Sequence, residues 1–253
     1  MPTALIRRPS PRLAEGLVTH IERTPVEVGL AFEQWQAYVD ALHETGWTTV
    51  EVPPIEECPD SAFVEDTMVV YDDLAVIARA GADERRAEAA AAAETVAAQG
   101  YRILHIADPG TLDGGDVLKI GPTIYVGHGG RTNVAGIEQL REAFAPLGGD
   151  VRAVPVQKVL HLKSAVTALP DGTVIGYEPL VDDPSAFDSF RAVPEEAGAH
   201  VVLLGEDRLL MAASAPRSAE LFADLGYTPV VVDISEFEKL EGCVTCLSVR
   251  LRR

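Results

Sequence analysis

The chain has 253 residues with an average globular composition, 47% hydrophobic and 24% charged, and no low-complexity linker, which predicts a single domain over residues 1–253. Its formal net charge of −18 disfavours nucleic acid and anionic lipid as partners and favours a cationic small molecule. The sequence lacks an apolar run of about 18 residues, a signal peptide and the cysteines of a disulfide scaffold, so we expect a cytoplasmic protein that does not enter a membrane.

The predicted elements form a loose repeat, in which each unit has two apolar runs joined by a short turn, then a helix, then one more strand. The complete units are, in chain order, a hairpin at 63–79 with an alanine-rich helix at 87–99 and a strand at 101–106; a hairpin at 114–127 with a helix at 133–144 and a strand at 151–156; a hairpin at 161–178 with a poorly patterned stretch at 179–196; and a hairpin at 200–214 with a helix at 217–225 and a strand at 228–234.

A fifth unit is divided between the two ends of the chain. The apolar run at 244–251 is expected to pair with the run at 3–9, and a helix at 30–43 and a strand at 48–53 complete the unit. The fold class is therefore α/β, a pseudo-symmetric five-bladed propeller of ββαβ units that closes through its terminal strands and leaves few exposed sheet edges. An open α/β sheet is the alternative architecture.

Polar residues interrupt the apolar runs near the start of the first strand in four units, and a radial arrangement would direct them to one central pocket. They are Glu65, Asp66, Asp113, Asp116, His161 and Cys246. Each residue alone has a structural explanation, since a cysteine in a strand is most often a small buried hydrophobe and the DGGD of residues 113–116 could be a tight turn, where glycine pairs are common. Their shared position in the repeat is what favours a functional site.

The pair Cys243 and Cys246 forms a Cys-x-x-Cys motif close to the C-terminus. A zinc site would need further ligands, and Cys58 is the only other cysteine, so we expect no metal and no cofactor. If the motif lies on a strand, residues three apart face opposite sides, and only one of the two thiols can enter a common pocket.

Five segments together resemble the motif series of the pentein superfamily of guanidine-modifying enzymes, in particular the dimethylarginine dimethylaminohydrolase family. They are SAFVEDTMVV, GTLDGGDVLKIG, GGRTNVAG, KVLHLKSAV and GCVTCLSVRL. The resemblance implies a five-bladed propeller and hydrolysis of Nω-methylated arginines to citrulline and methylamine or dimethylamine through a covalent thiouronium on cysteine. Arginine deiminases and amidinotransferases are longer relatives, and a non-catalytic binding protein of this fold would lack the cysteine, histidine and acids.

The resemblance also assigns roles to individual residues. It implies a catalytic set of Cys246 as nucleophile, His161 as general acid and base, and Asp113 as the group that orients the imidazole. The residues that it places around the substrate are Leu17, Asp60, Phe63, Glu65, Asp66, Arg85, Arg131 and Leu240. Within this group Arg85 and Arg131 would bind the substrate carboxylate, Asp60 and the carbonyls of Leu17 and Leu240 its ammonium group, and Phe63 its methylenes.

The same chemistry follows from the residue types. A guanidinium is a planar cation that carboxylates can hold by paired hydrogen bonds, while a thiolate attacks its central carbon. The bound cation and an imidazolium would favour ionisation of a thiol whose ordinary pKa is about 8.5, whereas the carboxylates would oppose it in the empty enzyme. The departing amine needs a proton, which a histidine can supply. We further expect that Cys243 could be oxidised against Cys246, that zinc on Cys246 and His161 would only inhibit, and that a homodimer is possible.

Overall fold

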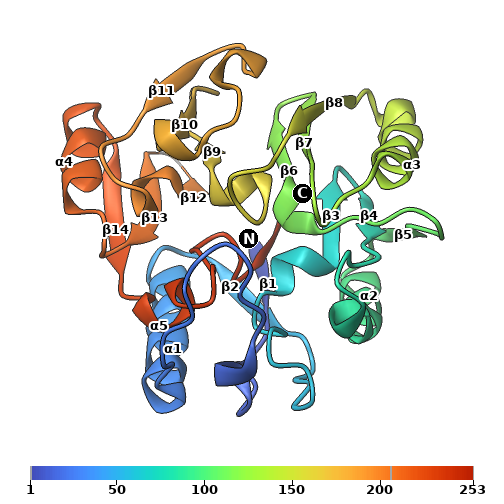
Figure 1. Ribbon diagram of the computed structural model, residues 1–253, viewed down its shortest axis with the longest axis horizontal. Helices are drawn as coiled ribbons and strands as arrows, with labels where there is room; N and C mark the ends of the chain where they lie inside the picture. Colours follow the sequence, from blue (N-terminus) through green and yellow to red (C-terminus); the bar gives the residue numbers. More distant parts are fainter. Residues whose placement is uncertain (1, 206, 253) are drawn as a thin grey trace.

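A computed structural model describes residues 2–205 and 207–252 of the chain. Within these residues five three-stranded sheets stand in a ring around a central axis (Figure 1). In hydrogen-bonding order the sheets are β3 (Met68–Tyr71), β4 (Leu74–Ile77) and β5 (Arg102–His105); β6 (Val117–Ile120), β7 (Thr123–His128) and β8 (Asp150–Pro155); β9 (Val166–Ala168), β10 (Val174–Gly176) and β11 (Phe190–Ala192); β12 (Val202–Gly205), β13 (Arg208–Ala212) and β14 (Thr228–Val232); and β15 (Val249–Leu251), β1 (Thr3–Ile6) and β2 (Thr48–Glu51).

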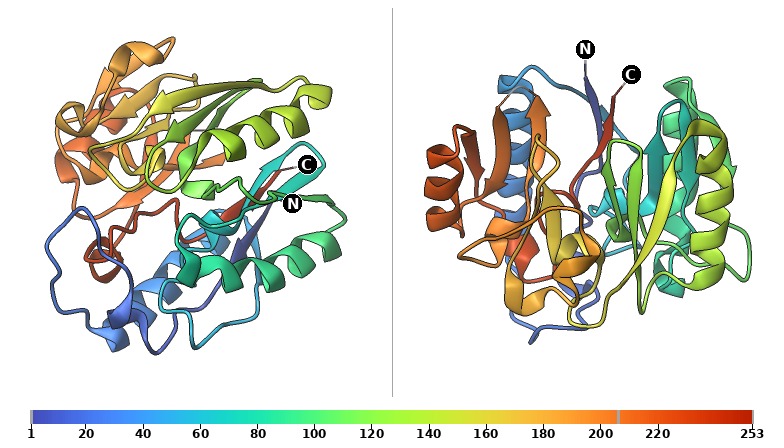
Figure 2. Two further views of the ribbon diagram at one scale, coloured as in Figure 1. Left: turned by 45° about the vertical axis from the view of Figure 1, so that its right-hand side comes forward. Right: turned by 90° about the horizontal axis from the view of Figure 1, so that it is seen from above.

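All five sheets have the same internal order, an antiparallel hairpin followed by a third strand that pairs in parallel with the second. The fifth sheet joins the two ends of the chain, because β15 pairs antiparallel with β1, with Thr3 opposite Leu251. These terminal strands run side by side through the middle of the ring in both views of Figure 2. The predicted five-unit propeller and its closure by the terminal strands are therefore confirmed, and the open sheet is excluded.

The longer helices lie outside the ring of sheets (Figure 1). The α-helices are α1 (Val28–Glu44), α2 (Ala89–Ala98), α3 (Val134–Phe144), α4 (Pro216–Asp224) and α5 (Ser235–Glu238). Helix α1 buries Trp35, Tyr38 and Leu42, which recur every three to four residues and so form one apolar stripe. Helix α3 begins where the Asn133 side chain accepts a hydrogen bond from the Gly136 N–H. The poorly patterned stretch of the third unit contains two single-turn 3₁₀ helices, η7 (Glu178–Leu180) and η8 (Pro184–Ala186), where other units have an α-helix.

The core lies between neighbouring units. Successive residues of an inner strand pack into different apolar clusters, as Val69 does on one side of β3 while Met68 and Val70 pack on the other. Because a strand points alternate side chains to opposite faces, strands buried on both faces are apolar throughout. This explains why the sequence shows continuous apolar runs rather than alternation. No helix within the described ranges has the length and apolar composition required to cross a membrane.

A short 3₁₀ turn precedes the first strand of each complete unit. These turns are η2 (Val64–Thr67), η4 (Gly114–Asp116), η6 (Leu162–Ser164) and η9 (Ala197–Ala199), and the remaining 3₁₀ helices are η1 (Leu13–Glu15), η3 (Asp83–Glu88) and η5 (Ala145–Leu147). The split unit has an equivalent turn, in which the Cys246 N–H donates to the Cys243 carbonyl at 3.0 Å. The polar residues that the sequence analysis placed on strands therefore lie in these turns or directly before them, and the C-terminal strand begins only at Val249.

Candidate active site

A small buried pocket on the axis of the ring brings together most of the residues predicted to form the site. Its walls contain Leu17, Asp60, Phe63, Asp66, Arg85, Arg131, Leu160, His161, Leu240, Glu241, Gly242 and Cys246. The cavity has a volume of about 20 Å³, and Cys246 is 6% exposed. Asp113 lies behind His161 and is fully buried, whereas Glu65 does not line this pocket. Nine of the predicted site residues therefore line one pocket, as the prediction requires. Asp113 does not line it and contacts it only through His161.

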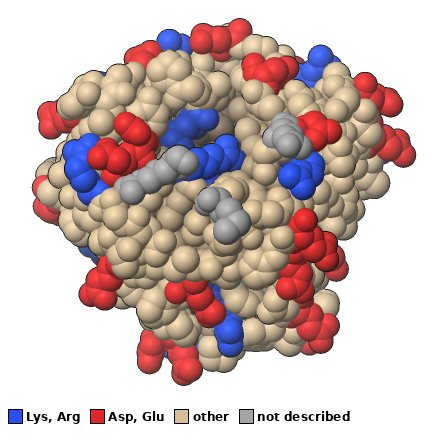
Figure 3. All heavy atoms as spheres, turned by 180° about the vertical axis from the view of Figure 1, so that it is seen from behind, with Lys and Arg blue, Asp and Glu red and all other residues tan. Residues whose placement is uncertain are grey.

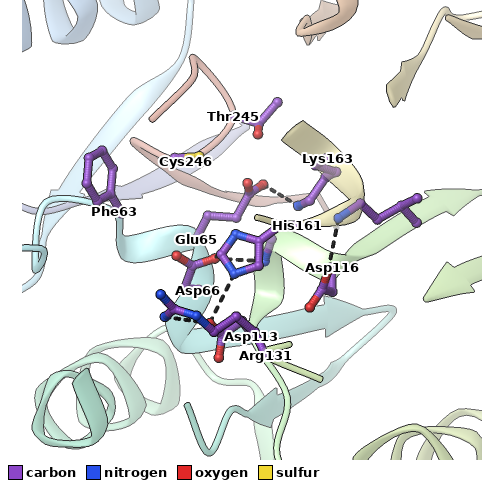
Figure 4. A network of polar contacts seen from close by, with 12 residues as sticks. Phe63, Glu65, Asp66, Asp113, Asp116, Arg131, His161, Lys163, Thr245 and Cys246 are labelled. Atoms are coloured by element: carbon purple, nitrogen blue, oxygen red, sulfur yellow. Dashed lines mark hydrogen bonds and ion pairs between the residues drawn. The ribbon is translucent and has the colours of Figure 1, made fainter. Parts of the chain in front are cut away.

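The imidazole of His161 is held between two carboxylates (Figure 4). Its Nε2 lies 3.0 Å from Oδ2 of Asp113, and its Nδ1 lies 3.9 Å from Oδ1 of Asp66. Asp113 is fixed in turn by the Gly81 N–H, which donates to its Oδ1 at 2.9 Å. Burial disfavours the imidazolium, but the charge of Asp66 and the hydrogen bond to Asp113 outweigh it and raise the pKa of His161 to about 9. The imidazole is therefore protonated at neutral pH.

The glycine pair in the motif LDGGD is required by this arrangement. A Cβ on Gly115 would lie 2.6 Å from both Oδ1 of Asp66 and Nδ1 of His161, so a side chain there would displace one of them. The Gly115 N–H also donates to Asp66 at 2.8 Å. The sequence analysis treated this motif as a turn and missed that Gly115 sets the spacing of the two catalytic-site groups.

Only Cys246 lines this pocket, as the sequence analysis expected, while Cys243 lines a neighbouring cavity. The segment that contains them is, however, not a strand. The residues between them form a turn, and the two Sγ atoms lie 3.3 Å apart. The Cys243 N–H also points to Sγ of Cys246, at 3.5 Å. The hydrogen bond between the thiols raises the pKa of Cys246 and lowers that of Cys243, and burial together with Glu65 and Asp66 raises the pKa of Cys246 further. Cys246 is thus a neutral thiol in the empty pocket, as the neighbouring acids led us to expect.

Arg85 is bound to carboxylates of the protein itself. Its Nη1 donates to Asp66 at 2.6 Å, and its Nε and Nη2 donate to Glu88 at 3.0 and 2.8 Å. These contacts hold the Asp66 carboxylate in place, and together with His161 they lower its pKa to about 2 against the opposing effect of burial. Glu88 is 1% exposed and was missed by the sequence analysis, although its spacing of three residues from Arg85 is that of an intrahelical ion pair.

Arg131 differs from Arg85 in its hydrogen bonding. Its Nη1 is buried, makes no hydrogen bond within the described part of the chain and lies 3.8 Å from Oδ2 of Asp113. Of the two arginines predicted to bind a carboxylate, Arg131 is therefore the one with a hydrogen-bond donor available for a ligand.

A loop from the N-terminal region covers the pocket and is fixed by two carboxylates. Asp60 accepts the Leu17 N–H at 3.2 and 3.1 Å, so in this structure the contact uses the amide of Leu17 and not its carbonyl. Glu241 accepts the N–H groups of Thr19 and His20 at 2.7 and 2.8 Å. The sequence analysis missed Glu241, whose backbone φ of 61° is unusual for a residue other than glycine and was not apparent from the sequence.

The structure places Glu65 outside the pocket, contrary to the predicted substrate-binding set. Its Oε1 forms ion pairs with Lys163 at 2.5 Å and with Arg250 at 2.6 Å, and its side chain lines a separate cavity. The physical reason is the 3₁₀ turn, in which successive side chains point about 120° apart, so that Glu65 and Asp66 face different sides.

The ring of five ββαβ units, with a cysteine, a histidine and acids meeting on its axis, is that of the pentein class of guanidine-modifying enzymes. No protein-family model matches the chain. The chain is 70% identical over 249 residues to the N(G),N(G)-dimethylarginine dimethylaminohydrolase of Streptomyces coelicolor, covering 98% of this chain and 96% of the relative. The chain belongs to the dimethylarginine dimethylaminohydrolase family.

Solved structures agree with this assignment. The dimethylarginine dimethylaminohydrolase of Pseudomonas aeruginosa, solved as a mutant complexed with citrulline, superposes with a TM-score of 0.91 at 33% identity and covers 98% of each chain. The N-terminal domain of ArgZ, covalently bound to a reaction intermediate, has a TM-score of 0.88 at 19% identity, covering 99% of this chain and 97% of that domain, and supports the fold alone.

Proposed function

We propose that this chain hydrolyses Nω-methylated arginines to citrulline and methylamine or dimethylamine, with Cys246 as the nucleophile. The observation that carries the proposal is that Cys246, His161 and Asp66 line one buried pocket whose acids can accept a planar cation. The 70% identical relative is named for this activity, and a 33% identical relative binds citrulline in its crystal structure.

The substrate guanidinium would lie over Cys246, with N–H groups donating to Asp66, while Asp113 orients His161 from behind. Its positive charge offsets those acids, so the pKa of Cys246 falls when the substrate binds and the thiol proton is lost. The thiolate then adds to the guanidinium carbon. The imidazolium of His161 gives its proton to the departing amine, which leaves a thiouronium on Cys246.

Hydrolysis requires the reverse use of the same imidazole. Neutral His161, still oriented by Asp113, takes a proton from a water molecule that adds to the thiouronium carbon. The carbon–sulfur bond breaks, the proton of the added hydroxyl group passes to the sulfur as citrulline is released, and His161 keeps the proton from water, so it is again an imidazolium. The proton that Cys246 gave up to solvent when the substrate bound is balanced by protonation of the released amine. One water is consumed and one amine is released for each turnover, and no cofactor takes part in any step.

The amino acid end of the substrate would be held by the other charged residues of the pocket. Arg131 has a buried donor available for the carboxylate, and Asp60 is an acceptor for the ammonium group. A cavity of about 20 Å³ does not hold an arginine side chain, so the loop held by Asp60 and Glu241 must move for the substrate to enter. The substrate class is thus a small cationic amino acid, and the whole of residues 1–253 forms the catalytic domain.

The test is incubation of the purified protein with arginine, monomethylarginine and asymmetric dimethylarginine, with citrulline and the released amine measured separately. We expect citrulline and alkylamine in equal amounts from the methylated substrates. Cys246→Ser is the matched control, because it removes the thiolate with the smallest change of shape and should abolish turnover. Turnover of unmethylated arginine alone, with ammonia as the product, would favour the deiminase alternative.

A further inference from the structure

A second cavity lies on the other face of the ring from the covering loop. It has a volume of about 300 Å³, at the lower end of the roughly 300 to 1,000 Å³ found for small-molecule sites. Figure 3 shows it as a hollow near the centre of that face, with Lys and Arg atoms at its bottom. The charged residues that line it are Glu65, Asp72, Lys119, Lys163, Arg250 and Arg252. Four cations around two acids are unexpected in a chain of net charge −18.

Two of the cations lie deep in the cavity and share one acid. Lys163 and Arg250 both pair with the same oxygen of Glu65, at 2.5 and 2.6 Å. Two cations against one acid leave one positive charge at the deep end of the cavity without a counter-charge, and Lys163 is only 8% exposed. A buried charge without a counter-charge is costly, and an anion would reduce that cost.

The other two cations lie nearer solvent and have no acid partner within the described residues. Lys119 donates to the Val70 carbonyl and Arg252 to the Leu203 carbonyl. Desolvation and three neighbouring cations lower the pKa of Lys119 to about 7, so its charge is partial at neutral pH and a bound anion would restore it. The residue is exposed at the mouth of the cavity. These side chains are held by carbonyl groups, and the Arg252 guanidinium also lies over the ring of Trp47, 5.5 Å from its centroid. They extend the positive surface from the deep end of the cavity to solvent.

This cavity is separate from the Cys246 pocket, although the two share a wall. Neighbouring residues divide between them, since Glu65 and Thr245 line the basic cavity while Asp66 and Cys246 line the pocket. The proposed reaction uses none of the four cations.

We propose that this basic cavity, defined by Lys119, Lys163, Arg250 and Arg252, binds a small multivalent oxyanion such as a phosphate group. Lysine and arginine donors around a concave site are the usual partners of phosphate oxygens. The volume admits inorganic phosphate or a small phosphate ester, and four basic against two acidic side chains favour a ligand with more than one negative charge. An anion bound at Lys163 and Arg250 would contact the two side chains that pair with Glu65. Glu65 in turn contacts the nucleophile's backbone, since its N–H donates to the Cys246 carbonyl at 3.1 Å.

The experiment is calorimetric titration with inorganic phosphate against chloride at constant ionic strength. The test variant is Lys119→Gln with Arg252→Gln, and the matched control is Arg152→Gln, an exposed arginine paired with Asp150 elsewhere on the surface. We expect saturable binding of phosphate to the unaltered protein, a dissociation constant raised at least about tenfold in the double variant, and no change in the control. Lys119→Gln alone, which loses only a bond to a carbonyl, should give an intermediate effect and guards against misfolding of the double variant.

Two results would overturn the proposal. Equal dissociation constants in all of these proteins would mean that phosphate binds elsewhere, for example at Arg131, and absence of saturable binding to the unaltered protein would mean that there is no anion site. Because the titration needs no turnover, failure here is distinguishable from failure of the proposed activity.

Discussion

Replacing Asp113 by asparagine is expected to lower the pKa of His161 by about 1 to 2 units. The change keeps the shape of the side chain and removes the charge that lies 3.0 Å from Nε2. A hydrogen bond to a charged group contributes about 1.5 to 3 kcal/mol, and one pKa unit corresponds to about 1.4 kcal/mol, which gives this range. Since the pKa starts at about 9, it should stay above that of an ordinary histidine, because Asp66 remains.

The same pKa predicts a pH-dependent contribution of His161 to stability. Its folded value of about 9 exceeds the reference value of 6.5, so the folded protein holds this proton more tightly than the unfolded chain. The contribution is fully present below about pH 6.5 and is lost as the pH rises through about 9, and the difference of about 2.5 units amounts to about 3 kcal/mol.

Both expectations can be measured on labelled protein. The chain has 6 histidines, and the His161 imidazole signal is identified by its loss in His161→Gln and then titrated by NMR, with and without Asp113→Asn. The unaltered protein should have a higher free energy of unfolding than His161→Gln, and this difference should be about 3 kcal/mol larger near pH 6 than near pH 10. Titration of His161 near its ordinary value, or no shift in Asp113→Asn, would refute the electrostatic account of the site.

Three further outcomes follow from contacts in and over the pocket. Hydrogen peroxide should oxidise Cys243, the thiol with the lowered pKa, to a sulfenic acid; Sγ of Cys246, 3.3 Å away, then attacks this sulfur and expels water to form a disulfide, so that activity is lost and returns with dithiothreitol. Cys243→Ser should form no disulfide by intact mass, and unchanged recovery of activity in that variant would contradict the mechanism. Gly115→Ala should reduce kcat/KM about 100-fold with an unchanged circular dichroism spectrum, because its Cβ would lie 2.6 Å from Nδ1 of His161, and near-normal activity would show that the imidazole does not depend on this spacing. Glu241→Gln weakens the acceptor of two loop N–H groups and should change KM by about fivefold, measured by initial rates, with little effect on kcat, so an equal loss in both would argue against a role in loop closure.

The fold was predictable because its repeat is visible in the sequence. Apolar runs buried on both faces, turn residues between them and helices at regular spacing indicated five similar units. Closure followed from the unmatched runs at the two ends, and β15 does pair with β1. The extent of β15 was wrong, since the apolar letters of residues 244–248 fit a strand as well as a buried turn, and only the bond from the Cys246 N–H to the Cys243 carbonyl distinguishes them.

The site was predictable in its membership but not in its directions. Cys246, His161 and Asp66 line one pocket because their turns occupy equivalent places in three units. Which way each side chain points depends on its position within the turn, and that position cannot be read from composition. Asp113 and His161 are the residues just before their turns, whereas Asp66 and Cys246 lie three residues after the corresponding position in theirs. The sequence analysis assumed one common position in the turn, and the structure has two.

The third position of these turns accounts for the basic cavity. Glu65 and Thr245 stand one residue before Asp66 and Cys246, and Lys163 occupies the same position in the turn that follows His161. Since successive residues of a 3₁₀ turn point about 120° apart, one repeated turn supplies side chains to both sides of the shared wall. The charge on one side therefore acts on the other: Glu65 holds two cations in the basic cavity and also raises the pKa of Cys246. An anion that drew those cations away from Glu65 would raise the pKa of Cys246 further. With an anion in the basic cavity and no substrate in the pocket, Cys246 would therefore ionise less readily.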